Sequence, residues 1–165
     1  MNILYSIIGV LLAWFMIMLS ILFHETGHLS GWKMSTRSKN WHITAGSGKK
    51  LFESKRICLN ALPFGGTFLE MEETVPETKK GIVIMLLGGP VFTLLLTLFL
   101  SFIQRFIPAD AFRTSFFTAR QLVLFVRNYN IVLFLITIIP WKHPKFLSPI
   151  AFSDGMSILR VLWNK

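Results

Sequence analysis

The chain has 165 residues, 53% of them hydrophobic, and a mean hydropathy of +0.58, which together exclude an ordinary soluble domain and predict one membrane domain, 1–165. Its formal charge of +9 would also suit nucleic acid. However, nine of its 17 Lys and Arg residues lie between residues 31 and 80 and four follow residue 140, both beside apolar runs, so the charge favours membrane orientation and no nucleic-acid partner is expected.

The first apolar run, residues 3–23, is long enough to cross a bilayer as a helix, because about 20 apolar residues suffice. It lacks a basic n-region and a small-x-small cleavage site, and it is too long for a cleaved signal peptide. The first span is therefore expected at about 3–29. It is predicted to end near Ser30 and Gly31, because a glycine can terminate a helix.

The end of this run carries the sequence His24-Glu25-Thr26-Gly27-His28. Residues four apart share one face of a helix, so the two imidazoles can bind one metal ion. Zinc suits such a site, and the glutamate can then take the proton of an activated water in peptide hydrolysis. The pattern also occurs by chance on helices that bind nothing, but ionisable groups that continue a membrane span favour a functional site.

Residues 32–80 are polar and basic and predict a small β-hairpin region, at about 41–72, on the membrane surface. Its strand-like fragments are 41–44, 50–52 and 56–59. Glycines punctuate them as turns or bulges. The acidic stretch 70–77 that follows is expected to be a solvated connector.

Two further spans are predicted at 81–103 and 119–140, with 104–118 as the loop on the far side. In the first of these, Gly88-Gly89-Pro90 should permit close helix approach and a kink. The second carries the polar residues Arg127, Asn128 and Asn130. These must face protein or a water-filled cavity, either for hydrogen bonding between helices or for catalysis.

The apolar run 146–163 is compatible with a re-entrant segment or a fourth span. The predicted fold is therefore an α-helical polytopic membrane protein with three to four membrane segments and a small membrane-associated β-hairpin region. Lys and Arg are concentrated in 31–80 and 141–165, which places the N-terminus outside and the metal site toward the cytoplasm.

A catalytic zinc usually has three protein ligands, so one more is required. Three candidates lie on the expected side, namely His42, His143 and Asp154. Asp154 is favoured, because it is the carboxylate embedded in an apolar segment, where a metal offsets the cost of burial. Gly155 would let the backbone approach the first helix. The alternative is that Ser153 or Asp154 only caps a helix.

These landmarks resemble the site-2 protease family of intramembrane zinc metalloproteases. His24-Glu25-x-x-His28 is similar to its zinc motif, and 46–52 and 61–68 to its membrane-associated β region. Gly89-Pro90 resembles its Gly-Pro motif. Ser153-Asp154-Gly155 resembles its Leu-Asp-Gly motif, whose aspartate is the third zinc ligand.

The chain departs from the family at Thr93 and Thr137, which stand where asparagines are usual, and it has no room for a PDZ domain. The resemblance implies a bacterial or archaeal cell-membrane enzyme that cuts transmembrane or membrane-inserted peptides. A homo-oligomer or a membrane partner stays open. The alternative function is a catalytically inactive peptide-binding or immunity protein, which has no need of Glu25.

A transmembrane peptide must be unwound before hydrolysis, and an exposed sheet edge could then pair with it. The segment 62–68 is the candidate edge, since its proline suits an edge strand and its glycines permit close backbone approach. The predicted substrate-binding residues are Gly65, Gly66, Thr67 and Phe68. A simple turn between strands is the alternative.

Overall fold

The structure is a computed structural model that describes residues 3–36, 40–70, 76, 78–108, 111, 118–142 and 152–163. Within these ranges the elements follow in the order α1 (Ile3–Ser35), β1 (Trp41–Glu53), β2 (Ile57–Glu70), α2 (Lys79–Ile103), α3 (Ala119–Ile138) and α4 (Asp154–Trp163). The expected helical membrane protein with a small β-hairpin region is confirmed.

Three helices, α1, α2 and α3, are long and apolar enough to cross a membrane. Many of their large apolar side chains are exposed, as lipid-facing residues would be, with Ile3 76% and Leu98 58% accessible. By contrast, α4 has ten residues, or about 15 Å of helix, and does not reach across a bilayer. Residues 146–151 of the predicted fourth segment lie outside the described residues.

The prediction that α1 ends near Gly31 is wrong, because the helix continues to Ser35. Gly31 serves packing instead: a Cβ there would lie 2.5 Å from the carbonyl oxygen of Ile84 in α2. One turn earlier, a Cβ on Gly27 would overlap the carbonyl of Gly88. The two glycines let the α1 and α2 backbones touch on the side of α1 that carries the histidines.

The two strands form an antiparallel sheet with several register shifts, and Gly46 and Gly48 adopt positive φ angles of 78° and 82°. Ile43 lies opposite both Ile57 and Phe68, so the start of β1 runs between the two ends of β2. The segment 66–70 is therefore an edge. Among the described residues no other strand pairs with its outer side.

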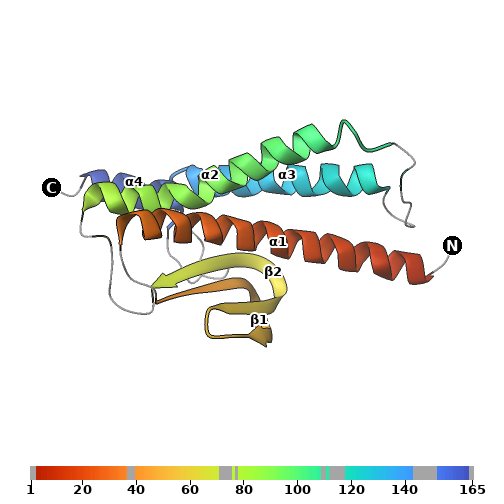
Figure 1. Ribbon diagram of the computed structural model, residues 1–165, viewed down its shortest axis with the longest axis horizontal. Coiled ribbons are helices and arrows are strands. Elements are labelled where there is room, and N and C mark those ends of the chain that lie inside the picture. The colour runs from red at the N-terminus through yellow and green to blue at the C-terminus, as the bar shows by residue number, and fades with distance from the viewer. Residues whose placement is uncertain are drawn as a thin grey trace.

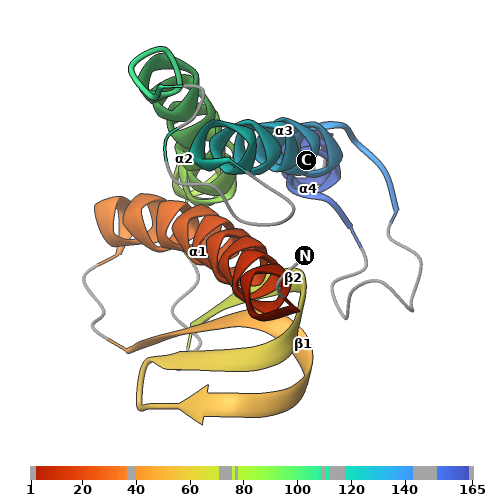
Figure 2. The same ribbon diagram turned by 90° about the vertical axis from the view of Figure 1, so that its right-hand side faces the viewer.

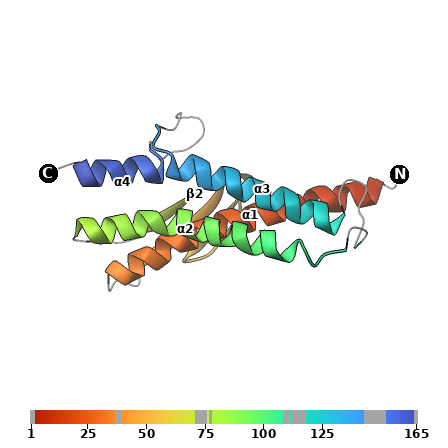
Figure 3. The ribbon, with the colours of Figure 1, turned by 90° about the horizontal axis from the view of Figure 1, so that it is seen from above.

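Figure 2 shows α1 between the sheet on one side and α2, α3 and α4 on the other. Two buried clusters hold the layers together, with Met18, Ile21 and Ala45 in one and Leu29, Trp32 and Ile43 in the other. The N-terminal half of α1 and the C-terminal half of α2 diverge (Figure 1). The α2 helix is not interrupted at Pro90. Seen from above, α4 continues the line of α3 beyond the connection between them (Figure 3).

Candidate metal centre

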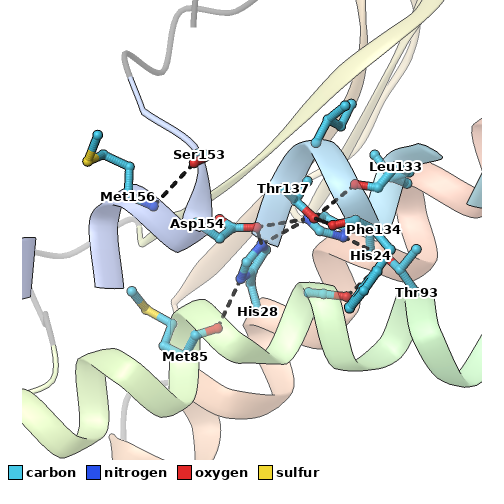
Figure 4. Close-up of polar contacts among 12 residues, drawn as sticks. His24, His28, Met85, Thr93, Leu133, Phe134, Thr137, Ser153, Asp154 and Met156 are labelled. Carbon is cyan, nitrogen blue, oxygen red and sulfur yellow. Dashed lines mark hydrogen bonds and ion pairs between the residues drawn. The ribbon is translucent and has the colours of Figure 1, made fainter. Parts of the chain in front are cut away.

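Three possible metal ligands from α1 and α4 converge on one point (Figure 4). The Nε2 atoms of His24 and His28 are 3.1 Å apart, and they lie 3.4 and 3.5 Å from Oδ2 of Asp154. In a tetrahedral zinc site with bonds of about 2.0–2.1 Å, two ligand atoms stand about 3.3 Å apart. The three side chains therefore fit one face of such a tetrahedron.

The far nitrogens of the two imidazoles are occupied. His28 Nδ1 lies 2.9 Å from the carbonyl oxygen of Met85, and His24 Nδ1 lies 2.8 Å from Oγ1 of Thr93. A carbonyl oxygen can only accept, so Nδ1 of His28 carries a proton, and in the neutral ring Nε2 is then the bare nitrogen that can bind a metal. Metal-ligating histidines usually make an outer contact of this kind.

Asp154 owes its position to Ser153, which lies almost fully buried at the start of α4. The Ser153 hydroxyl accepts hydrogen bonds from the N–H groups of Met156 (3.2 Å) and Trp141 (3.1 Å) and donates to the carbonyl of Ile139 (2.8 Å). Ser153 thus caps α4 and ties it to the end of α3. The Asp154 carboxylate is left free to face the histidines.

The prediction that Gly155 brings the backbone close to the first helix is wrong. A Cβ at this position would overlap the carbonyl of Ile138, so the close contact is between α4 and the end of α3. The largely buried Oδ2 of Asp154 has no hydrogen-bond partner among the described residues. A buried carboxylate oxygen without a donor is costly, and a cation between it and the two imidazoles would remove that cost.

Glu25 is buried, with 5% exposure, and accepts a hydrogen bond from the backbone N–H of Phe68 in β2. Gly66 makes this contact possible, because a Cβ there would overlap the Glu25 carboxylate. The N–H of Ile43 donates to the carbonyl oxygen of Arg56 at 2.9 Å. It therefore points away from Phe68, which lies opposite Ile43 on the other side. The N–H of Phe68 is therefore on the outer side of the edge, facing α1.

The three candidate ligands and Glu25 open onto a cavity of about 470 Å³ with a mainly apolar wall. Gly65, Gly66 and Phe68 of the predicted substrate segment line it, whereas Thr67 pairs with Thr44 in β1. The rest of the wall comes from α1, β2, α2, α3, α4 and the residues that flank the connection between α3 and α4. Its members include Met85, Leu86, Tyr129, Leu133, Ile136, Thr137, Trp141 and Phe152.

Several residues at the centre were not assigned to it from sequence. A Cβ on Gly89 would overlap Nε2 of both histidines, so this glycine leaves room for the ligands as well as for helix approach. Thr93 is fully buried against His24, and the Thr137 hydroxyl, in the cavity wall, donates to the carbonyls of Leu133 (2.9 Å) and Phe134 (3.1 Å). The Gly27-x-x-x-Gly31 spacing was the available signal that α2 would pack here.

Of the other two candidate ligands, the structure describes one. His42 is in β1 opposite Leu69 and does not join the ligand group, and His143 lies outside the described residues. The polar residues of α3 make contacts between helices: Asn130 donates to the Ser20 hydroxyl at 2.9 Å and Arg127 to Gln104 at 3.1 Å. Of the two roles that sequence left open for them, these contacts match hydrogen bonding between helices.

Comparison with known proteins agrees with this geometry. The sequence profile of peptidase family M50 matches residues 12–139, which include the two histidines and Glu25, while Asp154 lies beyond the match. No protein of curated function matches the chain. The chain is an integral membrane protein, and its described residues contain three candidate spans. Since the profile covers most of its length, the chain belongs to peptidase family M50, the site-2 protease family of metallopeptidases.

Proposed function

We propose that the chain is an intramembrane zinc metalloendopeptidase in which His24, His28 and Asp154 hold the metal and Glu25 is the catalytic base. The observation that carries this proposal is the convergence of the three ligand atoms, at 3.1 to 3.5 Å from one another, on a cavity that also contains Glu25. Zinc bound there would supply a Lewis acid that polarises the scissile carbonyl and acidifies water.

The chain's own residues account for the proton transfers. Glu25 takes a proton from the attacking water and delivers it to the leaving amine as the carbon–nitrogen bond breaks. The hydrogen bond from the Phe68 N–H holds the Glu25 carboxylate at the cavity wall. The apolar wall limits the entry of bulk water, which strengthens electrostatic interactions within the cavity.

The substrate is a transmembrane or membrane-inserted peptide that binds in extended form along the outer edge of 66–70. A peptide unwound in lipid needs partners for its freed backbone groups, and an unpaired strand edge offers them. Gly65, Gly66 and Phe68 reach the cavity, and Thr67 holds the edge to β1. The Phe68 N–H lies next to Glu25, so a peptide bound along this edge would pass beside the catalytic base.

We place the N-terminus outside and the metal centre toward the cytoplasm, because Lys and Arg are concentrated beside the sheet and in the C-terminal tail. Single cysteines would test this in a variant whose buried Cys58 is replaced by serine. An impermeant reagent added to cells should label Phe106→Cys, in the turn after α2, and spare Lys49→Cys. Labelling of Lys49→Cys alone would reverse the orientation.

The enzyme hypothesis predicts a specific result for Glu25→Gln. This variant removes the base and none of the three ligands, so its zinc content should equal that of the wild type. Cleavage of membrane-inserted reporter peptides by the reconstituted protein should fall at least about 100-fold. A chelator should stop the wild-type reaction, and added zinc should restore it.

The inactive alternative has no observation in its favour, since Glu25 is present and lies at the cavity. It would gain support if the zinc-loaded wild type released no more product than Glu25→Gln or a sample without protein. A wild-type protein that retains no zinc after purification and dialysis against zinc would remove the metal centre itself.

A further inference from the structure

The side chain of Thr93 lies between the α2 backbone and one of the candidate ligands. It is fully buried, and its Oγ1 is 3.1 Å from the carbonyl oxygen of Gly89, one turn back in the same helix. The same Oγ1 is 2.8 Å from Nδ1 of His24 (Figure 4). Both contacts involve one hydroxyl group, which has a single proton to donate.

The direction of the second contact follows from that single proton. The Gly89 carbonyl has no proton, so the contact with it exists only when the Thr93 hydroxyl donates. The hydroxyl oxygen must then accept from His24, which places the ring proton on Nδ1. A neutral imidazole has one N–H, so Nε2 of His24 would then offer a bare lone pair to a cation bound among His24, His28 and Asp154.

The two histidines differ in how firmly this choice is made. The Nδ1–H of His28 donates to the backbone carbonyl of Met85, which can only accept. His24 faces a hydroxyl, which by itself could donate or accept. If Thr93 turned its proton toward Nδ1, the ring proton of His24 would move to Nε2 and block the ligand position.

We propose that Thr93 is a positioning residue of the metal centre: anchored on the Gly89 carbonyl, its hydroxyl accepts the Nδ1–H of His24 and so presents Nε2 to the metal. This inference rests on the metal centre proposed above. It assigns to Thr93 a task that requires an acceptor oxygen at this point of α2. It also gives a role to a hydroxyl group that is fully buried beside one of the proposed ligands.

Three variants separate this role from simple packing. Thr93→Val keeps the shape and removes the hydroxyl, and Thr93→Ser restores the hydroxyl without the methyl group. Thr97→Val is the matched control, because Thr97 is also buried in α2 and its hydroxyl donates one turn back to the Thr93 carbonyl at 2.9 Å. Thr97 takes no part in the metal centre. Zinc affinity would be measured by competition with a chromophoric chelator on protein in detergent.

Thr93→Val should weaken zinc binding about 10- to 100-fold, as loss of an outer partner of a ligating histidine typically does. Thr93→Ser should bind zinc within a few-fold of the wild type, and Thr97→Val should bind it as the wild type does. Equal affinity of Thr93→Val and wild type would overturn the proposal while leaving the metal centre intact. If the wild type bound no zinc, the proposed function would fail instead.

The zinc-loaded wild type provides a test without any substitution at Thr93. Nitrogen–proton correlation spectra of histidine-labelled protein distinguish a ring that carries its proton on Nδ1 from one that carries it on Nε2. The His24 signals are identified by their loss in a His24→Asn variant. With zinc bound, the Nδ1–H form is expected at His24, and the Nε2–H form there would overturn the proposal even if Thr93→Val did not fold.

Discussion

The two halves of α1 have different surroundings although they belong to one continuous helix. Between residues 3 and 19 most large side chains are exposed, among them Leu4 at 62% and Leu11 at 58%. From Ser20 to Trp32 the helix is largely covered, and its buried residues include His24, Glu25 and His28 at 5 to 8% exposure. The apolar half thus faces outward and the polar half faces protein.

This difference shows what allows ionisable groups in a membrane helix. The second half of α1 has the sheet on one side and α2 on the other, so its polar groups meet hydrogen-bond partners and not lipid. The first half is covered by the sheet only around Trp14, Ile17 and Met18 among the described residues, and most of it consists of residues that lipid solvates well. The predictions below ask whether the covered half is arranged around a metal.

The largest effect is expected from removing the ligand that α4 brings to the covered half. Asp154→Ala should weaken zinc affinity by more than the about 10- to 100-fold that is typical when a hydrogen-bond partner of a ligand is lost, because here the ligand itself is removed. His42→Ala, in β1 and away from the ligand group, is the control and should retain zinc. Metal analysis after gel filtration measures both. Stoichiometric zinc in Asp154→Ala would show that the ligand set is wrong.

A smaller effect tests the sheet edge that meets α1 at Glu25. Peptide substrates in which one amide at a time is replaced by an ester lose a single N–H donor. If the substrate pairs with 66–70, cleavage should fall about 2- to 10-fold at every second position, since a ladder hydrogen bond contributes about 0.5–1.5 kcal/mol. Rates that do not alternate along the peptide would exclude strand pairing.

How much the sequence could predict depends on the range of the interaction. His24, Glu25 and His28 are one helical turn apart, so their shared face follows from helix geometry alone. Asp154 is distant in sequence and came from elimination and from the family resemblance. Thr93 and Gly89 could not be assigned, because their contacts depend on the rotation of α2 about its axis relative to α1.

The glycines show the same limit. Gly31 fits a helix end and a tight helix crossing equally well, and sequence reasoning chose the helix end. The presence of Gly27 four residues earlier favours the crossing. Similarly, Gly155 was predicted to approach α1, but the contact is with Ile138, because Ser153 ties the start of α4 to the end of α3.

The last prediction compares one substitution in each half of α1. Gly27→Ala places a methyl group against the carbonyl of Gly88, and overpacking of this kind costs about 1–3 kcal/mol unless the helices separate. Leu11→Ala removes side-chain atoms from an exposed position and should change the free energy of unfolding by less than about 0.5 kcal/mol. Unfolding by SDS in mixed micelles, followed by circular dichroism, measures both.

Because separation of α1 from α2 also moves Gly89 away from the histidines, Gly27→Ala should in addition bind zinc more weakly than Leu11→Ala. Equal stability and equal zinc affinity in the two variants would mean that the two halves of α1 do not differ as their burial indicates.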